Sequence, residues 1–209
     1  MYRDRHDAGR RLAEELARFA GDEDVVVLGI PRGGVIVGGE IAGRLDLALD
    51  VVVASKIGAP HNPEYAIGAV DADGRVTPNP QAGYDVAELE HLARPVRDKI
   101  RRRIELYRGG EEPLDLEGAT VIVADDGIAT GLTALAAVRY VRAQGVERIV
   151  LAVPVIASGS ISAFAQEVNE IVAPEQPAHF MAVGQFYRHF AQTSDDEVLE
   201  VLREFGYGE

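Results

Sequence analysis

The sequence lacks cysteine, an excess of positive charge and any long apolar run. Without cysteine there is no disulfide, zinc–thiolate site or thiol nucleophile. Lysine and arginine number 21 against 34 acidic residues, a net charge of −13, which argues against a protein that wraps nucleic acid. No apolar run approaches the roughly 18 residues of a membrane-spanning helix, and residues 1–11 are strongly charged. We therefore expect no signal peptide, no membrane anchor and a cytoplasmic location.

Apolar runs bounded by turn residues alternate with stretches of helical periodicity along the 209 residues. This alternation predicts one α/β domain, a mostly parallel twisted sheet with helices on both faces. The predicted strands lie at about 25–30, 49–55, 66–70, 120–124, 149–155 and 170–173. The predicted helices lie at about 4–20, 35–47, 86–107, 133–143 and 160–168, before a last helix capped by Ser194 and Glu197. The remainder of the segment 61–84 has no clear pattern, and we expect it to be a mobile flap.

The segment 121–133 reads Val-Ile-Val-Ala-Asp-Asp-Gly-Ile-Ala-Thr-Gly-Leu-Thr, a buried strand, a glycine-containing loop and the start of a helix. Small residues let the backbone approach a phosphate, and the helix N-terminus and the hydroxyls of Thr130 and Thr133 supply donors. Asp125 and Asp126 would repel a phosphate beside them, so they must serve another part of the same ligand. Sugar hydroxyls are the natural candidates, and the segment predicts a sugar-phosphate site.

Two common nucleotide fingerprints are absent. Gly127 and Gly131 are too close together for a P-loop, no lysine follows them, and Gly29–Gly34 lacks the pattern Gly-x-Gly-x-x-Gly. The five histidines show no metal-ligand spacing such as His-Glu-x-x-His. The sequence therefore disfavours a kinase and a dinucleotide-binding enzyme.

The strand, acidic pair and Ala-Thr-Gly-Leu-Thr loop of 121–133 resemble the hallmark of the type I phosphoribosyltransferases. The resemblance implies that Asp125 and Asp126 hold the ribose hydroxyls of phosphoribosyl pyrophosphate (PRPP). It also implies that the 5′-phosphate is held by Ile128, Ala129, Thr130, Gly131, Leu132 and Thr133. More loosely, the whole chain resembles a bacterial subgroup of the family without an assigned acceptor.

Two other predicted strand ends extend the resemblance. Arg32, Gly33 and Gly34 resemble the family's pyrophosphate loop, and Lys56 stands where the family begins its flexible catalytic loop. The resemblance implies that these four residues bind pyrophosphate and that Arg32 and Lys56 are catalytic. Lys56 and Lys99 are the chain's two lysines against nineteen arginines, and a lysine in so arginine-rich a chain indicates a need for a compact ammonium.

The implied fold has a core at about 25–155 and a small hood from about 1–20 and 174–209. The hood would bind the base, with Phe186 and Tyr187 as stacking candidates, although core packing explains these two aromatic residues equally well. Ala129 stands where the family's 6-oxopurine enzymes carry an aspartate, so that specificity is not supported. Gly127 replaces a bulkier residue of the family.

The resemblance implies a pentosyltransferase of nucleotide metabolism that moves a phosphoribosyl group between pyrophosphate and a nitrogenous base. Mg²⁺ is the implied cofactor, held mainly by the substrate and not directly by protein ligands. The implied partners are PRPP, a small-molecule acceptor and a second copy of the chain in a homodimer.

Other interpretations remain open. The alternative function is a non-catalytic regulator that binds PRPP; a sugar-phosphate hydrolase is a third hypothesis, but only one strand end supplies carboxylates. Asp125 and Asp126 could instead cap a helix or belong to a phosphorylated receiver domain, and Lys56 could be a solvated charge. The basic run at 94–108 is more typical of a solvated or subunit-contacting helix face than of a ligand site.

Overall fold

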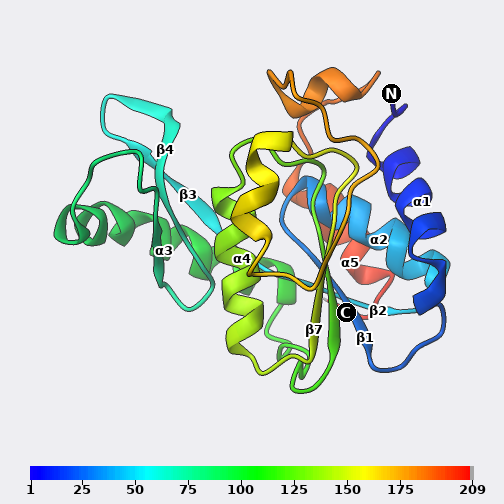
Figure 1. Ribbon diagram of the computed structural model, residues 1–209. Coiled ribbons are helices and arrows are strands. Elements are labelled where there is room, and N and C mark those ends of the chain that lie inside the picture. The colour runs from blue at the N-terminus through cyan, green and yellow to red at the C-terminus, as the bar shows by residue number, and fades with distance from the viewer. Residues whose placement is uncertain (208–209) are drawn as a thin grey trace.

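A parallel five-stranded sheet forms the centre of the computed structural model, which describes residues 1–207 (Figure 1). Its strand order is β2-β1-β6-β7-β8, and every neighbouring pair is parallel. The strands are β1 (Val25–Gly29), β2 (Ala48–Val51), β6 (Thr120–Ala124), β7 (Arg148–Ala152) and β8 (Glu170–Val172). The predicted α/β class is confirmed.

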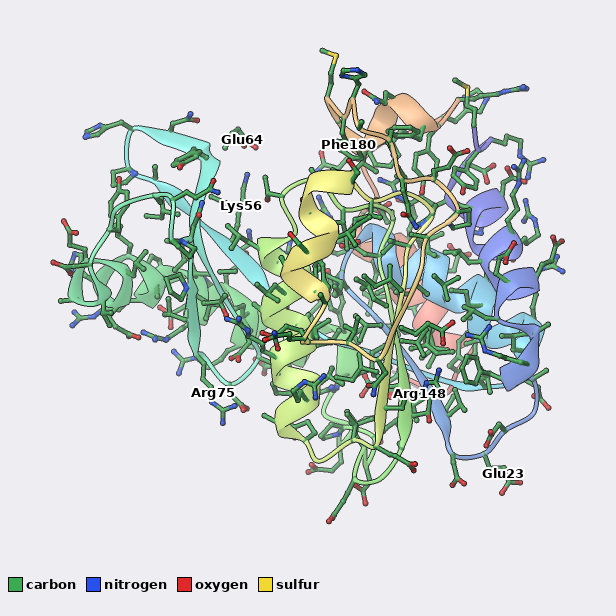
Figure 2. The ribbon with its side chains drawn as sticks, in the orientation of Figure 1. Glu23, Lys56, Glu64, Arg75, Arg148 and Phe180 are labelled. Carbon is green, nitrogen blue, oxygen red and sulfur yellow. The ribbon has the colours of Figure 1, made fainter. Side chains whose placement is uncertain are left out.

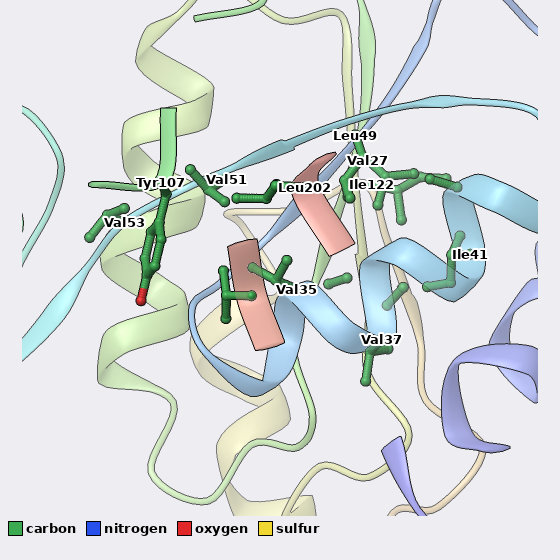
Figure 3. Close-up of a cluster of buried hydrophobic side chains, with 14 of the residues drawn as sticks. Val27, Val35, Val37, Ile41, Leu49, Val51, Val53, Tyr107, Ile122 and Leu202 are labelled. Carbon is green, nitrogen blue, oxygen red and sulfur yellow. The ribbon is translucent and has the colours of Figure 1, made fainter. Parts of the chain in front are cut away.

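Helices cover both faces of this sheet. Successive strand residues point to opposite sides, and the apolar residues of β1 therefore enter two different cores. Val25 and Val27 face the helices α1 (Arg5–Glu15), α2 (Gly33–Leu45) and α5 (Asp195–Arg203). Val26 and Leu28 face the helix α4 (Leu132–Ala143) and the 3₁₀ helix η2 (Ser158–Phe164). Figure 3 shows the first of these cores, which includes Val27 of β1, Ile41 of α2 and Leu202 of α5. We call the sheet with these helices the body.

A second sheet projects from the body (Figure 1). It is antiparallel, in the order β3-β4-β5, with β3 at Ser55–Ala59, β4 at Asn62–Val70 and β5 at Val76–Pro78. The helix α3 (Val86–Arg108) packs against it, starting at a capping box of Asp85 and Glu88. We call this sheet with α3 the arm. The predicted strand at 66–70 is confirmed as the second half of β4, but β4 begins earlier, at Asn62, and β5 in the same segment was not predicted.

Several predicted boundaries also change. The run 49–55 is not one strand: β2 ends at Val51, and β3 starts at Ser55 in the other sheet. Val52, Val53 and Ala54 are buried where the chain passes from body to arm, so an apolar run hid the junction. The predicted helix at 160–168 is the 3₁₀ helix η2, whereas the capping box of Ser194 and Glu197 is confirmed. Within residues 1–207, no helix is both long enough and apolar enough to span a membrane.

Candidate active site

Two strand-to-helix loops of the body meet at the carboxyl ends of β1 and β6. These strands are neighbours, and the Ile30 amide donates a hydrogen bond to the Ala124 carbonyl at 2.9 Å, which joins the two loops. Beside them lies a cavity of about 440 Å³. It is lined by Arg5, Ile30, Pro31, Arg32, Gly33, Asp125, Asp126, Thr133 and residues 190–193. A crevice beyond the strand ends is the usual place for a ligand in such sheets.

The start of α2 packs directly on the acidic pair, and glycine makes this possible. A Cβ atom on Gly33 would lie 2.0 Å from Asp126 Oδ2. A Cβ atom on Gly34 would lie 2.5 Å from the Ala124 carbonyl oxygen and 2.9 Å from Asp125 Cα. Gly34 is buried beneath the cavity, so its lack of a side chain has a packing reason independent of any ligand.

Asp125 and Asp126 point into a region of little solvent. The amide of Asp126 donates to Asp125 Oδ1 at 2.8 Å, and Arg5 Nε donates to Asp126 Oδ2 at 2.7 Å. Burial, followed by the charge of Asp126, raises the pKa of Asp125 well above its ordinary value. Burial also raises the pKa of Asp126, although the Arg5 guanidinium opposes this shift. Burying the two charged carboxylates therefore costs free energy, which hydrogen bonds from a bound ligand would offset.

Arg5 and the C-terminal segment form the opposite wall of the cavity. Arg5 Nη1 donates to the Ala191 carbonyl at 2.8 Å, and its guanidinium carbon lies 4.0 Å from the centroid of the Phe190 ring. Nothing in the sequence distinguished Arg5 from the other arginines near the N-terminus. The two ends of the chain, from which the family resemblance implied a common hood, pair with each other at Tyr2 and Tyr187.

The two aromatic residues expected to bind a base do not line the cavity. Tyr187 is buried with its ring 5.6 Å from that of Tyr2, and its hydroxyl donates to the Asp126 carbonyl at 2.6 Å. Phe186 packs on Phe180 at a ring distance of 5.4 Å. The aromatic side chain that lines the cavity is Phe190. These contacts favour the packing interpretation of Tyr187, and base stacking stays a prediction.

The loop after Asp126 surrounds a smaller cavity of about 170 Å³. It is lined by Asp125, residues 127–134 and Val183, so it shares Asp125 and Thr133 with the larger cavity. The residues expected to bind a phosphate, Ile128 to Thr133, all line it. Gly131 precedes α4 with φ 78°, which favours glycine. A Cβ atom on Gly127 would lie 2.6 Å from Val183 Cγ1, which explains glycine at this position.

The two cations expected to hold pyrophosphate occupy different surroundings. Arg32 lines the larger cavity, and its Nη1 lies 4.0 Å from Asp195 Oδ1. Lys56 is the second residue of β3, not the end of a body strand. It does not line the cavity; its Nζ donates to Glu64 Oε2 at 2.8 Å, and Figure 2 shows both side chains on the arm. The structure therefore brings Arg32, Gly33 and the acidic pair together and places Lys56 apart.

Within residues 1–207, no three histidine or acidic side chains are grouped so that they could hold a metal ion by themselves. The carboxylates at the cavity are the pair Asp125 and Asp126. Such a donor set matches an ion that takes most of its ligands from water and from a substrate's phosphates.

Comparison with known proteins matches residues 2–167 to the family described as the phosphoribosyl transferase domain. The chain is 44% identical over 206 residues to a Mycobacterium tuberculosis protein named "Putative phosphoribosyl transferase Rv0571c". That match covers 97% of this chain but 46% of the relative, so the chain spans about half the length of this curated relative. The crystal structure of TT1426 from Thermus thermophilus has a TM-score of 0.82 and 42% identity, covering 98% of this chain and 99% of that one.

Proposed function

The chain belongs to the phosphoribosyl transferase family, and from this premise we propose that it transfers a 5-phosphoribosyl group between pyrophosphate and a nitrogen nucleophile. The observation that carries the proposal is the adjacency of two cavities at the ends of β1 and β6. The smaller has the lining of a phosphate site, the larger has room for a sugar and an acceptor, and Asp125 belongs to both.

Each group of residues has a separate role in this proposal. The loop from Ile128 to Thr133 binds the 5′-phosphate through main-chain amides and hydroxyls. Asp125 and Asp126 accept hydrogen bonds from the ribose 2′- and 3′-hydroxyls, and Arg5 has to share or release Asp126 Oδ2 when the sugar arrives. This exchange keeps the buried carboxylate paired in both states.

The reaction exchanges one bond at the sugar's C1 for another. The C1–O bond to pyrophosphate breaks with its electron pair on the leaving oxygen, the acceptor nitrogen forms the new C1–N bond, and the acceptor's proton passes to solvent water. Positive charge develops on the ribose ring and negative charge on pyrophosphate. Arg32 and Lys56, with the amides of Gly33 and Gly34, stabilise the departing anion.

Mg²⁺ is the cofactor that this chemistry requires. When bound, it would neutralise charge on the departing pyrophosphate, with Asp125 and Asp126 as the nearby protein carboxylates. The acceptor is a planar nitrogenous base in the larger cavity, which Phe190 lines with Arg5 packed over its ring. A homodimer and a cytoplasmic location remain predictions.

A regulator that binds PRPP without turnover is the second candidate. It is favoured by one observation: Lys56, the proposed catalytic lysine, is paired with Glu64 and does not line the cavity.

The test combines calorimetry with a screen for turnover. We expect the protein to bind PRPP and ribose 5-phosphate with Mg²⁺, and to release pyrophosphate when one of a panel of purine and pyrimidine bases is added. Asp125→Asn combined with Asp126→Asn replaces two charged acceptors with neutral amides, which should weaken the sugar's hydrogen bonds and lower the affinity for both ligands by about 100-fold. Tight PRPP binding without release for any base would support the regulator. No binding of either ligand would overturn both functions.

A further inference from the structure

One face of α3 carries cations toward the candidate site. Lys99, Arg103 and Tyr107 are spaced four residues apart, so they lie on the same side of the helix. The Tyr107 end of this face is fixed by a contact, because its hydroxyl donates to Asp195 Oδ1. The same carboxylate oxygen lies 4.0 Å from Arg32 Nη1. Tyr107 and Arg32 therefore share the carboxylate of Asp195, and Arg103 and Lys99 follow Tyr107 at about one and two turns along the same face of α3.

Four cations from three elements are close enough for their charges to interact: Arg32 before α2, Lys56 on β3, and Lys99 and Arg103 on α3. Of these, Arg32 is the one that lines the cavity. Partial burial and the positive charges of Arg103, Arg32 and Lys56 lower the pKa of Lys99, while Asp195 opposes the shift. The carboxylates that contact this cluster are Asp195 and Glu64. A concentration of positive charge is unusual in a chain of net charge −13 and indicates a polyanionic ligand.

The two lysines of the chain both belong to this cluster, and their charges interact. Lysine carries a compact charge on a flexible stem, which suits a ligand that changes its charge and position, whereas arginine suits a fixed planar partner. The segments that carry the lysines are 43 positions apart, so the arm brings together what the sequence separates.

We propose that Lys99 and Arg103 of α3 bind the pyrophosphate group of the substrate together with Arg32 and Lys56. This assignment rests on the proposed function. Arg32 lines the larger cavity and not the smaller one, which the 5′-phosphate loop surrounds. A sugar held by Asp125 and Asp126 with its 5′-phosphate at Thr130 directs its other anionic group to Arg32 and α3.

The proposal is tested with Lys99→Met combined with Arg103→Met, which keeps the helix and removes two charges. The matched control is Arg94→Met combined with Arg101→Met, since these exposed residues lie on the opposite face of α3. Calorimetry with PRPP, ribose 5-phosphate and inorganic pyrophosphate, each with Mg²⁺, is the readout. Thermal unfolding of all variants checks that α3 still packs.

We expect the Lys99 and Arg103 variant to lose about 10-fold in affinity for PRPP and pyrophosphate and to bind ribose 5-phosphate within about twofold of the unchanged protein. The single variant Lys99→Arg, which keeps the positive charge and leaves Arg103 intact, should retain most of the affinity for PRPP and pyrophosphate. Unchanged PRPP affinity, or an equal loss in the control, would overturn the assignment while leaving the proposed function intact. Failure of the unchanged protein to bind both sugar phosphates would instead overturn the proposed function.

Discussion

The body and the arm hold their polar side chains in opposite ways. In the body, Asp126 and Arg5 are 17% and 12% exposed and joined at 2.7 Å, and Gly34 leaves no space for a side chain. On the arm, Lys56 is 41% exposed and its partner Glu64 is 89% exposed. A surface ion pair of that kind contributes about 0–1 kcal/mol and exchanges partners easily. The residues proposed for the sugar are thus held in place in advance, while the lysine proposed for the leaving group can change its partner.

The largest effect is expected from adding a side chain at Gly34, where the start of α2 packs tightly on the end of β6. Gly34→Ala places a Cβ atom 2.5 Å from the Ala124 carbonyl oxygen, and we expect it to lower the free energy of unfolding by about 3 kcal/mol or more. Gly43→Ala on the same helix is the control, because its Cβ atom would meet only Phe205 at 3.8 Å. It should stabilise the protein by roughly 0.5–1 kcal/mol. Urea denaturation measures both; equal effects would show that the contact is not tight.

Thr130→Ala removes a hydroxyl from the lining of the smaller cavity. A hydrogen bond to a charged phosphate contributes about 1–3 kcal/mol, so the free energy of binding should become less favourable by that amount. The loss should be the same for ribose 5-phosphate and PRPP, because both carry the 5′-phosphate. Calorimetry with the two ligands checks this expectation, and a loss confined to PRPP would place the hydroxyl at the pyrophosphate instead.

Asp125→Asn separates the effect of the buried carboxylate on protein stability from its effect on sugar binding. Because burial raises the pKa of Asp125 in the folded protein, the folded state retains a proton that the unfolded state has released. This difference therefore destabilises the protein as the pH rises above the unfolded value of about 4. We expect the variant to become more stable than the unchanged protein from pH 4 to 7 while binding ribose 5-phosphate less tightly.

Melting temperatures across that range measure the difference. Asp24→Asn, at an exposed carboxylate, is the control and should show no such trend. A variant that loses stability at pH 7 would mean that the Asp125 carboxylate stabilises the fold.

The smallest expected effect lies on the arm. Glu64→Gln releases Lys56 from its ion pair at 2.8 Å, so PRPP affinity should rise by no more than about threefold, since exposed pairs are weak. Salt should reduce the difference between the two proteins. Titrations of PRPP at two ionic strengths test this, and a fall in affinity would show that Glu64 positions Lys56 for the ligand.

The residues that sequence analysis located best belong to continuous segments. The strand at 120–124, the acidic pair and the loop to Thr133 are local, because hydrophobic run, turn and helix start follow one another along the chain. The arm was predicted only in part, as its helix and the strand at 66–70, because β3 and β5 are short and β4 begins with polar residues and a proline. Arg5 and Phe190 were missed because a cavity wall made from both ends of the chain has no local signature.

The sequence by itself determined the parallel α/β class, the sugar-phosphate motif and the family, since each depends on periodicity or on residues within about a dozen positions. Only the tertiary structure decided that Arg5 pairs with Asp126, that Gly34 is fixed by packing, and that Tyr107 of α3 and Arg32 meet at Asp195. The physical reason is that burial and charge act through space, so the partners of a side chain depend on how distant segments pack.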